Sequence, residues 1–258
     1  MSVETASKPI VSVPAAPVDT RSASLRAVYI IWYRDILRYW RDRWRLVASL
    51  AQPLLFLLVF GSGLSSSLGS AFGRGTGISY IQFMYPGIIG MSILFLIGKA
   101  LGGTTQAMIQ GLILLVLAPF VGVKLNLLTV MELVPLAAVL AFGLASFGVA
   151  LASMMKSLQG FQVVMNFLMM PMFFLSGALF PLTNLPGWMT WLTRADPASY
   201  GIDPIRRVVL ANSGLPHVDS LGLTINGQVL PIPLEAAIML GFGAILLGVA
   251  VVMFQRRD

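Results

Sequence analysis

Residues 133–155 read LVPLAAVLAFGLASFGVALASMM and contain no Asp, Glu, Lys or Arg. A helix needs roughly 17 to 25 apolar residues to cross the hydrocarbon core of a bilayer, and this stretch is long enough. Its small residues, such as Gly143, Ser146 and Gly148, allow close contact between helices. The stretch therefore predicts a transmembrane helix in a packed bundle or dimer.

Five further apolar stretches lie at residues 46–63, 80–97, 104–123, 161–180 and 234–254. Prolines within such spans, including Pro53 and Pro171, are tolerated because neighbouring groups satisfy the freed backbone. The chain is 57% hydrophobic and 10% charged, whereas soluble domains are about one quarter charged. These features exclude an ordinary soluble enzyme and predict an all-α integral membrane protein with six transmembrane helices.

The N-terminal part of the chain differs from the spans. Residues 1–20 are rich in Pro, Ser, Val and Ala and lack the order of a signal peptide, so we expect a disordered cytoplasmic tail before one membrane domain, 21–258. Residues 25–44, LRAVYIIWYRDILRYWRDRW, have the spacing of an amphipathic helix with arginines on one face. Such a helix suits the headgroup region, and a basic flank that only sets orientation is an equal alternative.

The distribution of basic residues predicts the orientation. Six spans place both termini on one side, and with the N-terminus inside, twelve Lys and Arg are cytoplasmic against five outside. Because cytoplasmic loops are enriched in Lys and Arg, we expect a multi-pass protein of the cell membrane with both termini in the cytoplasm.

Several kinds of chemistry have no sequence support. The pair Gly98-Lys99 is followed by Ala100, so no phosphate-binding loop is present. Cysteine is absent and His217 is the sole histidine, so we expect neither a metal site nor a catalytic residue. The span interiors carry no ionisable residue, which disfavours an ion-coupled carrier, and Glu235 is expected to be an ordinary interfacial carboxylate.

The end of the fifth span is the most distinctive passage. It reads FLSGALFP at 174–181, then Leu185-Pro186, then DPASYGIDPIR at 196–206. We expect Pro181 to end the helix and residues 199–210 to form a short helix that carries Arg206 and Arg207. The tryptophans Trp188 and Trp191 suit an interface, so a pair of short helices is predicted at the outer membrane face.

This passage resembles the type-2 ABC exporter permeases, which include drug-resistance, nodulation-factor, and polysaccharide or teichoic-acid exporters. Members have Phe-Leu-Ser-Gly, a proline, Leu-Pro, and Pro-x-Ser before Asp-x-x-Arg, in the order found here. With the basic lead-in and the six-span layout, the resemblance covers nearly the whole chain after Thr20.

The resemblance implies that two permeases pair, as a homodimer or heterodimer, and that separate ATPase subunits bind ATP and Mg on the cytoplasmic side. It implies that the amphipathic lead-in helps to form the ATPase-docking surface, and that the short outer helices re-enter the outer leaflet and close the exit. The candidate docking residues are Arg34, Asp35, Arg38, Arg41 and Asp42. The candidate outer-gate residues are Phe174, Ser176, Gly177, Pro181, Pro186, Pro197, Asp203 and Arg206.

One segment departs from the family. Similar permeases have a longer second span and an acidic, helical cytoplasmic loop that contacts the ATPase, whereas here residues 93–97 run almost directly into 98–103. Either residues are missing from this segment or the chain couples weakly to any ATPase, and we favour missing residues. The leading hypothesis is the permease subunit of an exporter for an amphipathic drug, lipid or lipid-linked glycan. An ATP-independent channel or lipid scramblase is the alternative, and a membrane enzyme is disfavoured because catalytic carboxylates and histidines are scarce.

Overall fold

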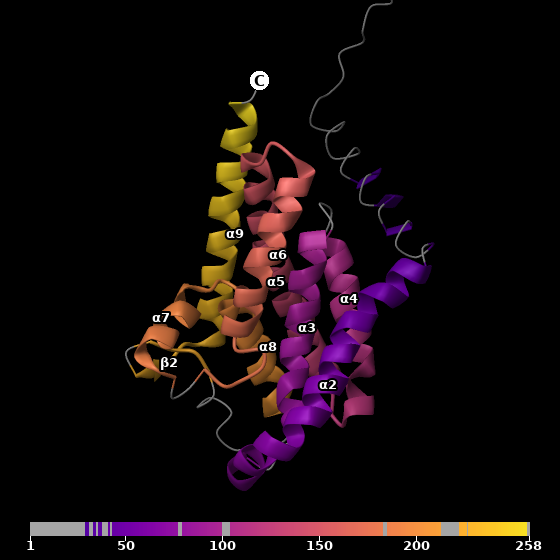
Figure 1. Ribbon diagram of the computed structural model, residues 1–258, viewed down its shortest axis with the longest axis vertical. Helices are drawn as coiled ribbons and strands as arrows, with labels where there is room; N and C mark the ends of the chain where they lie inside the picture. The colour runs from indigo at the N-terminus through magenta and orange to yellow at the C-terminus, as the bar shows by residue number, and fades with distance from the viewer. Residues whose placement is uncertain are drawn as a thin grey trace, which may run out of the picture.

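The computed structural model describes residues 29–30, 33–34, 36–37, 41, 43–76, 79–99, 104–182, 185–212, 222–225 and 227–256. In this part of the chain it has eight α-helices, a short 3-10 helix and one β-hairpin (Figure 1). The elements are α2 (Arg43–Thr76), α3 (Tyr80–Lys99), α4 (Thr104–Leu117), η1 (Ala118–Val121), α5 (Leu127–Met154), α6 (Leu158–Leu175), α7 (Gly187–Ala195), α8 (Ser199–Ala211), β1 (Thr224–Ile225), β2 (Gln228–Val229) and α9 (Ile232–Gln255).

Four helices are long and apolar enough to cross a membrane. Their candidate spans are Val47–Ser65, Leu127–Met154, Leu158–Leu175 and Ile232–Gln255. The apolar stretches of α3 and α4, Tyr80–Phe95 and Gln106–Val121, are shorter. The structure supports the predicted all-helical membrane protein. Helix α3 contains the whole of the predicted second span, 80–97, whereas the predicted third span, 104–123, is divided between α4 and η1 and ends at Val121.

Helix α3 lies at the centre of the bundle. Every residue from 83 to 94 is buried, and the helix packs against α2, α4, α5, α6 and α8. A helix that is apolar on all sides requires such surroundings, because each of its faces must be removed from polar solvent. The packing of α3 therefore decides how the other helices are arranged.

Three polar side chains in the first half of α3 bind backbone carbonyl groups of other segments. Tyr80 donates from its hydroxyl to the carbonyl of Leu179 at 3.0 Å, and the Gln82 amide donates to Gly122 at 2.9 Å. The Tyr85 hydroxyl donates to the carbonyl of Leu114, in the last turn of α4. The last four carbonyls of a helix need partners from outside it, and these contacts join α3 to three other segments.

A similar contact explains why Pro53 is tolerated in α2. Proline has no N–H, so the carbonyl four residues earlier, that of Ser49, lacks its usual helical donor. The side-chain amide of Gln110 in α4 donates to that carbonyl at 2.8 Å. The helix continues past the predicted boundary at residue 63 and ends at Thr76.

The fifth predicted span ends earlier than expected. Helix α6 ends at Leu175 with Ser176 as its C-cap, and Gly177 has φ of +75°. A glycine in the left-handed region just after a helix is a common stop signal, so the prediction that Pro181 ends the helix is wrong. The predicted short helix at 199–210 is confirmed as α8 and is preceded by another, α7.

The ends of the helices fall into two groups, at opposite ends of the long axis of the bundle. The turn between α5 and α6 lies at the same end as the C-terminus, while α7, α8 and the hairpin lie toward the other end (Figure 1). At the end of the bundle where the C-terminus lies, α3 and α4 do not extend as far as α5, α6 and α9 (Figure 1).

The close approach of α3 to the turn after α6 generates a first prediction. A Cβ at Gly87 would overlap the backbone of Ala178, which cannot move aside as a flexible side chain can. We expect Gly87→Ala to lower the free energy of unfolding by about 1–3 kcal/mol, the usual cost of overpacking. Thermal unfolding in detergent measures this loss. Gly241→Ala, where a Cβ meets nothing within 4 Å, is the control, and equal stability of the two variants would contradict the packing described.

Candidate functional site

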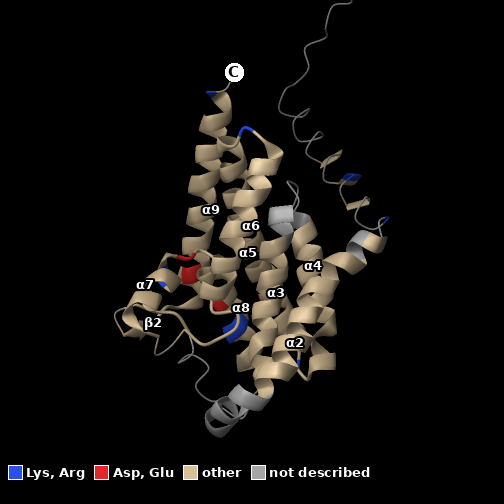
Figure 2. Cartoon of the chain, viewed as in Figure 1, with Lys and Arg blue, Asp and Glu red and all other residues tan. Residues whose placement is uncertain are grey.

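The most unusual element is α8, a short helix with a polar composition that is buried on every side. All residues from 201 to 210 are buried, and α8 packs between α3, α5 and α9. Its charged residues Asp203, Arg206 and Arg207 are at most 4% exposed. Figure 2 shows acidic and basic residues meeting where α8 lies beside the start of α9. Charges are rarely buried unless they are paired, so their contacts define the candidate site.

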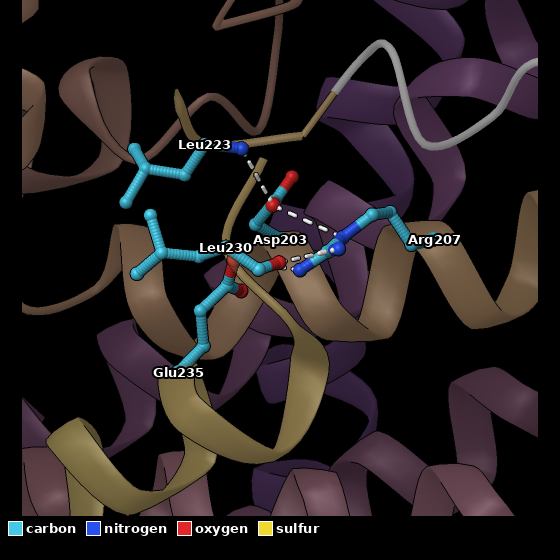
Figure 3. Close-up of polar contacts among 5 residues, drawn as sticks. All are labelled: Asp203, Arg207, Leu223, Leu230 and Glu235. Carbon is cyan, nitrogen blue, oxygen red and sulfur yellow. Dashed lines mark hydrogen bonds and ion pairs between the residues drawn. The ribbon is translucent and has the colours of Figure 1, made fainter. Parts of the chain in front are cut away.

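Arg207 is the hub of these contacts (Figure 3). Its Nη2 donates to Oε1 of Glu235 at 2.6 Å, and its Nη1 donates to the carbonyl of Leu230 at 2.8 Å. Its Nε lies 3.2 Å from Oδ2 of Asp203, one helical turn earlier. Through one guanidinium, α8 is thus tied to the first turn of α9 and to the strand end that precedes it.

The two carboxylates of this group share Arg207 as their cation. Oδ2 of Asp203 also accepts from the backbone N–H of Leu223 at 2.9 Å. The β-hairpin is closed by the Leu230 N–H, which donates to Leu223 at 3.0 Å.

Arg206 differs sharply from its neighbour. It is fully buried, yet among the described residues none of its three side-chain nitrogens has a hydrogen-bond partner. Its guanidinium carbon lies 4.7 Å from the centre of the Phe83 ring on α3, a cation–π contact. Burial of an ion without hydrogen bonds is costly. Arg206 therefore destabilises the buried position of α8, which Arg207 stabilises.

A second polar group fixes the entry to α8. The Asp196 carboxylate accepts from the Ala198 N–H at 3.0 Å, and the Tyr200 hydroxyl donates to the carbonyl of Arg194 at 2.8 Å. Arg194 in turn donates to the carbonyl of Thr224 at 3.0 Å. Burial raises the pKa of Asp196 to about 7, although hydrogen bonds to Ala198 and Ser199 oppose the rise.

The structure brings together only some of the candidate outer-gate residues. Ser176 and Gly177 are buried in the turn after α6, close to the start of α8, where Ser199 donates to the carbonyl of Leu175 at 3.3 Å. Asp203 and Arg206 lie farther along α8. The side chain of Phe174 is 42% exposed, Pro186 is exposed at the N-cap of α7, and Pro181 and Pro197 are half-buried.

The candidate docking residues are only partly described. Arg34 and Arg41 are exposed, whereas Asp35, Arg38 and Asp42 lie outside the described residues, as does His217. In the part of the chain that the structure describes, no cluster of three His, Cys, Asp or Glu could hold a metal ion.

Sequence reasoning missed two members of the buried cluster. It noted Arg207 without assigning it a role, and it placed Glu235 at the interface, whereas Glu235 is fully buried. Two signals were available: Arg207 follows Asp203 at the i, i+4 spacing that pairs charges on a helix, and Glu235 stands alone in the first turn of an apolar span. The contact of Arg206 with Phe83 joins positions far apart in the sequence, and no local pattern indicates it.

The contrast between the two arginines generates a second prediction. Arg207→Leu leaves two buried carboxyl groups without their cation and should lower the free energy of unfolding by about 3–5 kcal/mol. Arg206→Leu removes no hydrogen bond and should cost much less. Thermal unfolding compares the two with Arg256→Leu, a control at an exposed position. Equal losses at 206 and 207 would contradict the proposed difference.

The raised pKa of Asp196 generates a third prediction. A carboxyl group whose folded pKa lies above its unfolded value of about 4 favours folding below that value. This contribution is lost as pH rises through about 7. Asp196→Asn keeps the acceptor for Ala198 and cannot ionise, so it should gain stability relative to the natural chain between pH 4.5 and 7.5, by up to about 4 kcal/mol. Thermal unfolding across this range tests the prediction, and a difference that does not change with pH would contradict it.

Comparison with known proteins places the chain among membrane transport proteins. It is 26% identical to nodulation protein J of Rhizobium meliloti (strain 1021), over 81% of this chain and 91% of that protein. It is 25% identical to nodulation protein J of Rhizobium leguminosarum bv. trifolii, over 83% and 90%. It is also 23% identical to the inner membrane transport permease YadH of Escherichia coli (strain K12), over 77% and 89%.

The alignments also show that this chain lacks positions that its relatives have. The alignment with the R. meliloti protein extends over 249 positions, but 81% of 258 residues is about 209, so about 40 positions have no residue of this chain opposite them. The alignment with YadH extends over 232 positions against about 199 residues of this chain, a shortfall of about 33.

The family model described as ABC-2 type transporter matches residues 26–97 and 95–210, well over half of the chain. The two matched segments meet at the end of α3, next to the short connection to α4. The match is thus divided into two at residues 95–97, beside the segment in which the sequence departs from similar permeases. The matched segments include α8 and most of the helical bundle, and the chain therefore belongs to the ABC-2 type transporter family, as a membrane permease subunit.

Proposed function

We propose that the chain is the membrane half of an ATP-driven exporter that moves an amphipathic drug, lipid or lipid-linked glycan out of the cytoplasm. The observation that carries the proposal, beside family membership, is the lack of a site for a driving ion in the described spans. The four candidate spans contain two charged residues, Glu132, which is exposed, and Glu235, which is paired with Arg207. Ion-coupled carriers use free intramembrane carboxylates, so the energy is expected to come from a separate ATPase chain with its ATP and Mg.

The distribution of charge supports an orientation with both termini in the cytoplasm of a cell whose plasma membrane holds the protein. Lys156 lies between α5 and α6 and Arg256 directly follows α9. The turn between α5 and α6 is at the end of the bundle where the C-terminus lies (Figure 2). Arg206 and Arg207, two of the five basic residues assigned to the outside, are buried in the cluster and are not loop charges. The excess of basic loop residues on the cytoplasmic side is therefore larger than the sequence count indicates.

This orientation assigns roles to the two ends of the bundle. At the outer end, α7 and α8 close the exit, with Ser176, Gly177, Asp203 and Arg206 at the closure. At the cytoplasmic end, Arg34 and Arg41 belong to the surface for the ATPase subunit. A second permease copy completes the transporter, because members of the resembled family work in pairs.

One observation favours the alternative of an ATP-independent channel or scramblase. We infer that the positions without a counterpart in this chain belong between α3 and α4, where the two family matches meet and where similar permeases contact their ATPase. A chain that lacks this segment is expected to couple weakly to ATP hydrolysis. The two functions therefore differ in a property that can be measured, the dependence of transport on nucleotide.

The fourth prediction concerns the ATPase partner. We expect this chain to co-purify in detergent with the ATPase encoded beside it, and to change the rate of ATP turnover after reconstitution in nanodiscs. The matched variant carries the segment of about 35 residues from a relative, inserted between α3 and α4, and should change turnover more strongly. Absence of association for both forms, with lipid flux that persists without nucleotide, would overturn the exporter proposal and favour the alternative.

A further inference from the structure

The two neighbouring arginines of α8 hold the helix unequally. Arg207 donates to Glu235 of α9 at 2.6 Å and to the carbonyl of Leu230, just before α9, at 2.8 Å, whereas the guanidinium of Arg206 lies over the face of Phe83 on α3. The side of α8 that faces α9 is therefore anchored, and the side that faces α3 carries a buried cation without a hydrogen-bond acceptor. If α8 moves, the contact with α3 is the one that separates at least cost.

The remaining contact between α8 and α3 is apolar and tight. Ile202 packs onto Gly90 so closely that a Cβ at residue 90 would overlap the Ile202 side chain. Apolar contacts of this kind have no directional bonds to break. Separation would expose five guanidinium N–H groups, which match the oxygens of a phosphate or carboxylate group in planar, bidentate geometry.

The balance of charge indicates the sign of a ligand. Arg207 makes the printed contacts with both carboxylates, Oδ2 of Asp203 and Oε1 of Glu235. Among the described residues, Arg206 is therefore the guanidinium of the cluster whose N–H groups have no hydrogen-bond acceptor. An anionic group would neutralise it, whereas a cation would be repelled.

We propose that α8 swings away from α3 about its Arg207 anchor, and that Arg206 then binds the phosphate group of an amphipathic molecule at the exit. This inference rests on the proposed export function and extends it by naming the chemical class of the cargo or lipid. Its test requires neither the ATPase nor ATP turnover, so its failure and the failure of that function are distinguishable.

The chain contains no cysteine, which permits a reversible lock. In Gly90→Cys/Ile202→Cys the two Cβ atoms would lie about 3.5 Å apart, within the range of a disulfide, and Ile202→Cys removes the side chain that crowds residue 90. The ligand probe is radiolabelled decyl phosphate, added to the protein in decyl maltoside micelles. The reduced protein should bind the probe at least about tenfold more tightly than the oxidised protein, because only the reduced form can expose Arg206.

Matched variants show whether the loss of binding comes from the movement of α8 and from Arg206. In Gly61→Cys/Ile81→Cys the Cβ atoms would lie about 3.9 Å apart, so this disulfide joins α3 to α2 and should leave binding unchanged on oxidation. Arg206→Gln should abolish binding and Arg206→Lys should retain part of it. Competition by inorganic phosphate would identify the phosphate group alone as the ligand, and its absence would show that the alkyl chain contributes.

Equal binding by the oxidised and reduced forms of Gly90→Cys/Ile202→Cys would overturn the proposal, as would full binding by Arg206→Gln. If Arg206→Gln fails to fold, the comparison of the two redox forms still decides, because it uses a single protein. Binding that is lost on oxidation of both disulfide variants would also overturn it, since the effect would then not be specific to α8.

Discussion

The burial of α8 is the constraint on which the rest of the structure depends. A charged residue is costly to bury in an apolar bundle unless it has a partner, and Arg207 lowers this cost for two of the three charges of α8 by binding Glu235, Leu230 and Asp203. This requirement explains why α9 begins with a buried carboxylate and why the hairpin before it is closed against α8. It also explains how a short polar helix can pack beside the central helix α3.

The same arrangement connects stability with transport. Buried ion pairs contribute little net stability compared with apolar packing, but removal of one partner is strongly destabilising. The cluster therefore specifies one position of α8 and makes other positions costly, except where the contact is weak, at Arg206 and Phe83. A closure that is firmly hinged on one side and weakly held on the other suits an exit that must open and close.

Much of this architecture could be predicted from the sequence, and the errors of the prediction have physical causes. Long uncharged stretches identify α2, α5, α6 and α9 because a bilayer imposes a length and an apolar composition. The end of α6 after Leu175 was predicted too late in the chain. Gly177 adopts a positive φ and ends the helix before Pro181, although the proline is the more obvious stop signal in the sequence. Glu235 was taken for an interfacial residue because its partner, Arg207, is 28 residues away in the sequence. The shortness of the second span and of the loop after it was noticed in the sequence, and the alignments leave about 33 to 40 positions without a residue of this chain opposite them.

The pair formed by Arg207 and Glu235 fixes α8 as one unit. A double-mutant cycle on thermal unfolding, with Arg207→Leu, Glu235→Leu and the combination, tests this most directly. We expect Arg207→Leu to be strongly destabilised and the double variant to be more stable than Arg207→Leu alone, because Glu235→Leu removes one of the two buried carboxyl groups that lose their cation. Additive losses, with the double variant the least stable of the three, would contradict the claim that the pair anchors α8.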